Sequence, residues 1–586
     1  NHYGFSFLKC PTSLCNQPYK IRIVERTYLL MDDNQVKPVL VLDQNISQAV
    51  GEIIARSNYH DKEYTAKSFF DDNIVAALHT RCHEVFSGRT GVGKTHILRM
   101  LEYVINTQNL SAHEAAIYIN LQELMTWHNL PHTEEAAQRI ALHAFLQVLR
   151  VVIPSIRKAT HLRGSATATS SHPVDNIQEV GQKTPVPIKI VDKRATGNKL
   201  DASVVGGFEK IIPTVKGTIT GEQEDNTERV VEYQLVDKID PSKFVQEVNK
   251  ELSRYDLYVY LLIDEWAFIP VAAQPYFAEY IKRYFVTSQR IKIKIATIME
   301  RSKFRIGSTT SGFVGLSLGN ELNYRIDIDR KYVFDTDPIK TRDYCMEILY
   351  HQVRATLDTL PCGAVYLEEA YDIHSVADFC NHLFEDEVAV CSIVKVSGGN
   401  ARDLINIFAN SFRRANSSGN KICVEDVLYE ADEWFKLDKL LDLSSSLQSL
   451  LDTIVKYIVD KRNTRGFFIR PEDYNNSLLP ELVDGRVLHF IKKNERVPVL
   501  NNYRYHIIAI DYGAFICAEN GCFSKYLFDS DQYEDLCAEA TNCPQRIQYP
   551  PTCYHQFDLT RKIFAVQLAF LNESIDVIPA PIETAN

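Results

Sequence analysis

The first half of the chain carries continuous apolar runs separated by amphipathic stretches. The runs lie at 85–86, 116–121, 257–263 and 291–298, and a fifth strand is expected over 325–334. Such runs are typical of parallel strands that are buried on both faces. Helical spacing follows the first run over 97–104, and a further helix is expected over 276–285. Strands that alternate with helices predict an α/β fold with a parallel sheet.

The pattern changes after Asp337-Pro338, where Asp is a helix cap and Pro suits a first turn. From there to about residue 440 the spacing predicts helices. Gly398-Gly399 should end one helix, and Asn400 should cap the next. Arg402 then lies in a first turn, where a cation opposes the helix dipole unless an anion such as a phosphate pairs with it. A surface arginine is the alternative.

The C-terminal part predicts a smaller module. An amphipathic helix is expected over 447–458, a short strand over 467–469 and a helical piece over 478–483. Two strands, 487–491 and 505–510, flank a polar, basic loop. Helices followed by a basic hairpin are the outline of a winged helix. Its cations would contact DNA phosphates, or form the rim of a protein contact: Lys461, Arg462, Arg465, Lys492, Lys493, Arg496 and Arg504.

A chain of 586 residues is too long for one core. We expect an N-terminal segment (1–65), an α/β domain (66–335), a helical lid (336–440), a winged helix (441–516) and a tail (517–586). An insert over about 155–232 interrupts the α/β domain. Its short alternating pieces suggest strands or hairpins, since a structureless loop of this length is unusual. It is either a partner- or DNA-contacting element or a tolerated surface insertion.

Composition limits the classes of function. A formal net charge of −11 argues against a globally basic nucleic-acid coat protein but allows a local basic face. No apolar run approaches a membrane span and no signal-peptide pattern begins the chain, so we expect no membrane partner. Thirteen scattered cysteines indicate a reduced, cytoplasmic setting. The tail cysteines lack a C-x-x-C pair, which favours buried cysteines over a zinc site.

The segment from Gly88 to Thr95 fits the phosphate-binding pattern G-x-x-x-x-G-K-T without a mismatch. It lies between an apolar run and a helical stretch, as this loop requires. Backbone N–H groups and the helix N-terminus favour phosphate there. The lysine can reach the β- and γ-phosphates, and the threonine hydroxyl can bind Mg²⁺. The residues expected to bind nucleotide are Gly88, Arg89, Thr90, Gly91, Val92, Gly93, Lys94, Thr95 and His96.

The second half of such a site is an acidic pair after a buried strand. Asp264 and Glu265 follow the run at 257–263, at the sheet edge where α/β proteins bind ligands. Asp264 would hold Mg²⁺ directly or through water, and Glu265 would orient and polarise the attacking water. A solvated acidic pair is the alternative. At the end of the next strand, Thr297 or Glu300 could contact the γ-phosphate or that water.

Together, these stretches resemble the AAA+ ATPases, specifically the origin-recognition-complex-like initiator and loader branch. The stretch from Ile263 to Trp266 is more similar to bacterial ATP-binding proteins of this group, and the resemblance covers about residues 70–515. It implies bound ATP and Mg²⁺ and catalytic roles for Lys94, Glu265 and Arg402, the last as the sensor 2 arginine on the γ-phosphate. It also implies an arginine finger, for which Arg301, Arg305 and Arg325 are the candidates.

Two functions follow. The leading hypothesis is an ATPase that couples ATP binding and hydrolysis to engagement of double-stranded DNA or to complex assembly, as a homo-oligomer or with a protein partner. The alternative is a STAND-like signalling or antiviral defence switch, in which ATP drives assembly and the insert or tail recruits an effector.

Overall fold

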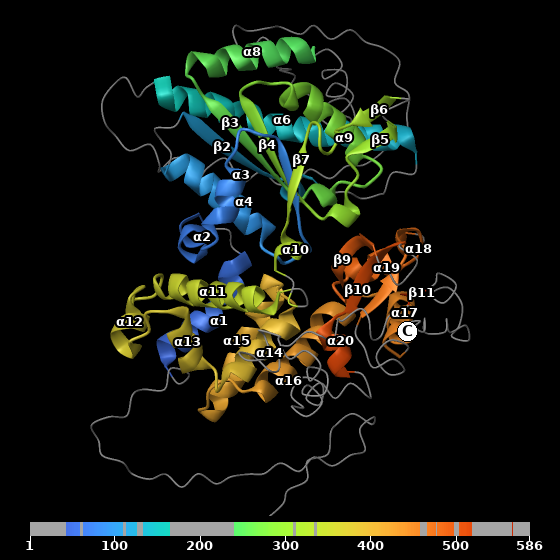
Figure 1. Cartoon of the computed structure of the whole chain (residues 1–586). Helices are drawn as coiled ribbons and strands as arrows, with labels where there is room; N and C mark the ends of the chain where they lie inside the picture. The colour runs from blue at the N-terminus through green and yellow to red at the C-terminus, as the bar shows by residue number, and fades with distance from the viewer. Residues whose placement is uncertain are drawn as a thin grey trace, which may run out of the picture. The chain divides into compact units, whose positions relative to one another are not determined.

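The computed structural model describes residues 43–58, 62–108, 113–125, 133–164, 240–308, 312–332, 334, 337–456, 466–475, 477–496, 503–517 and 565–566. The chain divides into two compact units, His60–Ile328 and Asn1–Tyr59 with Asp329–Asn586. We call them the first and second unit, and each is described by itself (Figure 1).

The first unit is built on a five-stranded parallel sheet in the order β2-β3-β4-β1-β7. Its strands are β1 (Glu84–Ser87), β2 (Glu114–Asn120), β3 (Tyr258–Asp264), β4 (Ile291–Thr297) and β7 (Asn323–Asp327). The predicted parallel α/β sheet is confirmed. The expected strand over 325–334 is wrong in its limits, because β1 offers partners to β7 only as far as Asp327. Helix α10 (Ile328–Lys331) follows instead.

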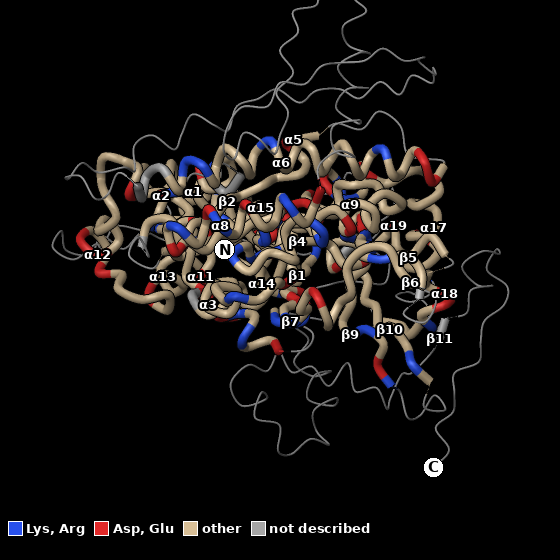
Figure 2. The backbone as a smooth tube through the Cα atoms, turned by 90° about the horizontal axis from the view of Figure 1, so that it is seen from above, with Lys and Arg blue, Asp and Glu red and all other residues tan. Residues whose placement is uncertain are grey.

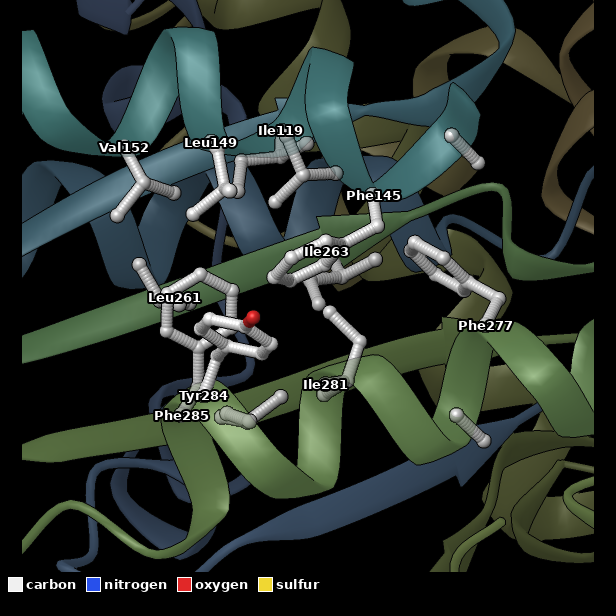
Figure 3. Packing of buried hydrophobic residues seen from close by; sticks show 14 of the residues in the cluster. Ile119, Phe145, Leu149, Val152, Leu261, Ile263, Phe277, Ile281, Tyr284 and Phe285 are labelled. Atoms are coloured by element: carbon white, nitrogen blue, oxygen red, sulfur yellow. The ribbon is translucent and has the colours of Figure 1, made fainter. Parts of the chain in front are cut away.

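One face of this sheet is covered by α6 (Glu134–Gly164), α8 (Pro241–Arg254), α9 (Gln274–Ile281) and η7 (Lys282–Val286). Figure 3 shows Phe145, Leu149 and Val152 of α6 packed toward Leu261 and Ile263 of β3. Alternate residues of a strand face opposite sides. Tyr260, Leu262 and Asp264 therefore point to the other face, against which α4 (Lys94–Tyr103) packs.

Helix α6 corrects the predicted start of the insert at about residue 155. The helix continues through Pro154 to Gly164, because Ile153 and Ile156 are buried in the core. The rest of the insert, including its expected strands, lies outside the described residues. Among the described helices, α6 alone is long and apolar enough to cross a membrane, by length and composition only. However, 56% of the apolar 18-residue window within this helix is buried inside the protein, and the core helix of a soluble protein has the same length and composition.

The remaining elements among the described residues of the first unit are short. They are α2 (Lys62–Ser68), α3 (Asp72–Leu78), η2 (Val104–Gln108), α5 (Leu121–Leu124), η6 (Trp266–Phe268), η8 (Met299–Arg301) and the antiparallel pair β5 (Arg305–Ser308) and β6 (Gly312–Gly315).

The first helix among the described residues of the second unit is α1 (Gln44–Asn58), which packs on α11 (Pro338–Leu357) and α15 (Ala401–Ser418). Just before α1, Asp43 accepts hydrogen bonds of 2.7 Å from both Tyr366 and Tyr371. The other helices are α12 (Tyr366–Tyr371), α13 (Val376–Leu383), α14 (Glu387–Ser397), α16 (Val424–Trp434) and η9 (Phe435–Leu440). The prediction that residues 337–440 are mainly helical is confirmed.

The C-terminal module contains α17 (Ser445–Val455), β8 (Gly466–Ile469), α18 (Pro471–Asn475), α19 (Leu479–Asp484), β9 (Leu488–Arg496), β10 (Arg504–Ile510) and α20 (Tyr512–Cys517). Strands β8 and β9 both pair antiparallel with β10, which confirms the predicted order of helices and strands. The apolar spacing over 559–571 predicts a helix. That prediction is wrong at 565–566, because Ala565–Val566 forms β11, parallel to β8. Cys522, Cys537, Cys543, Cys553 and His555 lie outside the described residues.

A cluster of buried charges joins the helices of the second unit to this module. Lys439 lies 2.7 Å from Asp403 Oδ2 and 2.8 Å from Asp511 Oδ2. Arg486 contacts Asp403 Oδ1 at 3.2 Å and also binds Asp438, and His489 Nε2 lies 2.6 Å from Asp511 Oδ2. Burial of charge requires such pairing. The buried charge cluster consists of Asp403, Asp438, Lys439, Arg486, His489 and Asp511.

Candidate nucleotide site

The loop between β1 and α4 has the backbone of a phosphate cradle. Gly91 and Gly93 adopt positive φ angles of 89° and 91°, a region that favours glycine. At Gly88 a Cβ atom would lie 2.6 Å from Val92 Cγ2, so a side chain there would have to displace the Val92 side chain. Helix α4 begins at Lys94, and its first N–H groups have no partners within the helix. This geometry suits an anion.

Lys94 is buried, and its side chain extends back to the start of the loop. Nζ donates to the carbonyl oxygens of Gly88 and Arg89, each at 2.9 Å. These bonds hold the positive charge within the loop, where the pattern predicts the β- and γ-phosphates. Thr95 follows in the first turn of α4 and is half-buried, and its role on Mg²⁺ stays a prediction.

Asp264 ends β3, and its side chain is fully buried. Its Oδ2 accepts a hydrogen bond of 2.8 Å from the Tyr118 hydroxyl, and its Oδ1 accepts one of 2.9 Å from the Glu265 backbone N–H. A carboxylate oxygen can accept two hydrogen bonds, so the group keeps acceptor capacity for a cation. Carboxylate and hydroxyl oxygens are ligands that Mg²⁺ accepts, and the donor set of Asp264 and Thr95 fits this ion.

Glu265 follows in a left-handed conformation, with φ of 56° and ψ of 42°. A non-glycine residue there carries strain of about 1–3 kcal/mol, and such strain is concentrated at functional sites. The next residue, Trp266, is fully buried against Phe277 and Phe304. This anchor and the Asp264 carboxylate fix the backbone of Glu265 between them.

Strand β4 lies between β1 and β3, and Thr297 pairs with Ser87 in register. The Gly88 N–H donates to the Thr297 carbonyl at 3.2 Å, so the end of β4 is bonded to the start of the phosphate loop. The Thr297 hydroxyl is buried and bonded to Ser302. Glu300 lies in the next turn, half-buried. The choice between these two as the sensor stays open.

Two further predicted residues have different surroundings. His96 Nε2 lies 3.3 Å from both Ser68 Oγ and the Thr65 carbonyl, which gives this ring a packing role against α2. Arg402 belongs to the second unit. As predicted, Gly398 ends α14 and the Asn400 side chain caps α15, accepting from the Arg402 and Asp403 N–H groups at 3.0 and 3.3 Å. The reach of Arg402 to a phosphate stays a prediction.

The three arginine-finger candidates are all exposed. Arg301 lies in η8, Arg305 on β5 and Arg325 on the edge strand β7. Exposure alone does not distinguish among them, and the finger stays unplaced.

Sequence reasoning missed Tyr118 and Arg99. Tyr118 holds Asp264, and the Arg99 guanidinium lies 3.5 Å from the centroid of the Tyr118 ring. The only signal in the sequence is a tyrosine in a strand otherwise rich in aliphatic residues, since its partner lies 146 positions away.

The basic hairpin of the C-terminal module is a second candidate site. Lys492, Arg496 and Arg504 are exposed and Lys493 is half-buried. Figure 2 shows basic residues on both β9 and β10. Arg496 and Arg504 are direct cross-strand partners. Lys461, Arg462 and Arg465 lie outside the described residues.

No protein-family model matches the sequence, and no curated protein matches it. Among solved structures, Cdc6p from Pyrobaculum aerophilum is 14% identical, over 75% of this chain and 87% of that one, with a TM-score of 0.27. Drosophila ORC bound to DNA is 12% identical, over 86% and 95%, with a TM-score of 0.27. Aeropyrum pernix ORC1 in complex with DNA is 12% identical, over 82% and 97%, with a TM-score of 0.28.

Proposed function

We propose that this chain is an AAA+-type ATPase that binds ATP with Mg²⁺ at Gly88–Thr95 and hydrolyses it. The observation that carries the proposal is the Lys94 ammonium held within a loop of left-handed glycines at the start of α4. A buried cation in such a cradle suits a polyanion, and the strand arrangement places Asp264 at the same sheet edge.

Each residue has a defined part in the reaction. Thr95 and Asp264 would hold Mg²⁺, which neutralises charge on the β- and γ-phosphates. Glu265 would orient a water molecule and accept its proton as the water oxygen bonds to the γ-phosphorus. The bond from that phosphorus to the β,γ-bridging oxygen then breaks, and ADP and phosphate leave. Arg402 would stabilise the γ-phosphate from the start of α15.

The C-terminal hairpin supports DNA as the partner. Directly opposed like charges destabilise a β-ladder, and Arg496 faces Arg504 across β9 and β10. An anion between them offsets that repulsion, and a DNA phosphate supplies it. We therefore include double-stranded DNA in the proposal, contacted through its backbone, with ATP binding favouring the DNA-bound form.

The test is DNA affinity at fixed ionic strength with a non-hydrolysable ATP analogue, with ADP and without nucleotide, read by fluorescence anisotropy. We expect the ATP analogue to tighten binding by about 5- to 150-fold over ADP, the usual range of allosteric coupling. In Lys94→Ala the three affinities should coincide. Equal affinities in the native protein would refute the coupling, and an absence of ATP binding would refute the nucleotide site itself.

A further inference from the structure

Tyr118 and Asp264 form a bond between neighbouring strands at the carboxyl edge of the sheet. Tyr118 lies on β2, and Asn120 at the end of β2 pairs with Asp264 at the end of β3. The phenol donates to Asp264 Oδ2 at 2.8 Å. The phenol hydroxyl is the donor in this bond, because an ionised carboxylate can only accept.

Arg99 fixes the tyrosine from the other side. Its guanidinium lies 3.5 Å from the Tyr118 ring centroid, a short cation–π contact. The same arginine pairs with Glu102 at 3.0 Å, and Glu102 also binds Lys62 of α2 at 2.9 Å. Because Arg99 lies on α4, the helix that begins with Lys94, this chain of contacts connects the phosphate-loop helix to Asp264.

The geometry points to Tyr118, held by Arg99, as a positioning residue that orients Asp264 toward Mg²⁺ in the nucleotide site. The inference rests on the proposed function. The carboxylate is held at both oxygens, by the Tyr118 hydroxyl and the Glu265 N–H. It therefore cannot turn freely, and its remaining lone pairs keep a fixed direction. Partners of this kind are worth about 10- to 100-fold in metal affinity or activity.

The same contacts extend to Glu265. The Asp264 oxygen that Tyr118 does not bind accepts from the Glu265 backbone, which is in a strained left-handed conformation. Loss of the phenol hydroxyl frees the carboxylate to rotate, which weakens this second bond as well. Tyr118 therefore influences both the metal ligand and the residue proposed to activate water.

The sheet supplies a matched control. Tyr260, on β3, donates to Glu114 Oε1 of β2 at 3.1 Å, another buried tyrosine–carboxylate bond between these two strands. It lies toward the opposite end of the strands, since Glu114 pairs with Tyr258. Tyr260→Phe removes one hydroxyl from the same sheet without touching Asp264.

The experiment compares Tyr118→Phe, Tyr260→Phe and Arg99→Gln with the native protein. Three quantities are measured: binding of a fluorescent ATP analogue in EDTA, the Mg²⁺ concentration for half-maximal ATP hydrolysis, and the thermal midpoint. We expect Tyr118→Phe to raise the Mg²⁺ requirement about 10-fold. Arg99→Gln should raise it less, since the hydroxyl remains. Metal-free nucleotide binding should stay native in Tyr118→Phe, and Tyr260→Phe should keep the native Mg²⁺ requirement.

A native Mg²⁺ requirement in Tyr118→Phe would overturn the inference, as would an equal rise in Tyr260→Phe, because either result leaves the hydroxyl a merely structural bond. Mg²⁺-enhanced binding of the ATP analogue provides the same comparison if turnover is slow. Failure of the native protein to bind the analogue would refute the proposed function as well, and it is seen before any variant is made.

Discussion

At the residue scale, Glu265 is both the proposed catalytic base and a residue with a strained, left-handed backbone. We expect Glu265→Gln to retain ATP binding and to lower ATP hydrolysis by at least about 100-fold, because an amide cannot accept the proton of the attacking water. The variant keeps the size and the backbone contacts of the native side chain. Single-turnover hydrolysis, measured beside equilibrium ATP binding, checks this. Hydrolysis at the native rate would show that another residue is the base.

The residues of the phosphate loop were predictable because they are consecutive in the sequence. Their residue types also indicate the backbone conformation, since glycine favours positive φ angles. Gly91 and Gly93 have the positive φ angles that the pattern implies. Contacts made by folding were not predictable. The Thr297 hydroxyl is bonded to Ser302, which no spacing rule indicates. Tyr118 reaches Asp264 across 146 positions, so only the strand order reveals this pair.

At the element scale, the β9–β10 hairpin makes a prediction about DNA. We expect the double variant Arg496→Gln/Arg504→Gln to weaken DNA binding and to reduce the slope of log affinity against log salt by about 2, one for each lost phosphate contact. The hairpin itself should lose little stability, because relief of a like-charge pair offsets loss of the exposed hydrogen bond from Arg504 to the Asn494 carbonyl. DNA affinity across a salt series, with the ATP analogue present, measures the slope.

The control for charge alone is Arg283→Gln/Lys421→Gln, which removes two cations from other elements. Arg283 pairs with Glu279 on the helix before η7, and Lys421 donates to the Asn381 carbonyl. This variant should keep the native slope. If the salt slope falls equally in both double variants, the two hairpin arginines contribute only to the overall charge of the protein and make no specific phosphate contacts.

The sequence predicted the ends of elements correctly where neighbouring residues determine them. It did not predict them where packing partners distant in the sequence determine them. The stop at Gly398 and the cap at Asn400 depend on neighbouring residues and are confirmed. The end of β7 depends instead on the four-residue length of β1. The continuation of α6 beyond Pro154 depends on burial of Ile156, which a proline inside the pattern conceals.

At the scale of the whole molecule, the buried charge cluster unites helix α15, η9 and the C-terminal sheet within the second unit. Asp403, next to Arg402, binds both Lys439 and Arg486. Because these pairs are buried, the start of α15 and the C-terminal module pack together as one assembly. Asp403 on α15 is therefore linked through Lys439 to Asp511, which directly follows β10.

This cluster also predicts how stability depends on pH. Burial would raise the pKa of Asp511, but the Lys439 ammonium and His489 lower it below its ordinary value. Burial of Asp403 is likewise outweighed by Lys439 and Arg486, so its pKa is lowered too. A carboxyl whose pKa is lowered by folding contributes stability above its ordinary pKa of about 4. That contribution is lost as the pH falls through the lowered pKa values.

Lys439→Met tests the cluster, because it leaves Asp403 and Asp511 buried without the ammonium. We expect a loss of about 3 kcal/mol in unfolding free energy at pH 7, near the lower end for a broken buried pair, since Arg486 and His489 remain. Lys436→Met is the matched control on the same helix. Its bonds to Asp432 and Glu433 are partly exposed, so it should cost at most about 1 kcal/mol.

The acid range separates an electrostatic role from a packing role. As the pH falls below about 4, the paired carboxylates contribute less to the stability of the native protein. The difference in unfolding free energy between the native protein and Lys439→Met should therefore become smaller. Lys436→Met should show no comparable change. Urea unfolding followed by far-UV circular dichroism at pH 7, 5 and 3.5 or so measures both trends. A gap that stays constant with pH would mean that Lys439 contributes through its buried methylenes, and the second unit would then owe its cohesion to packing rather than to paired charge.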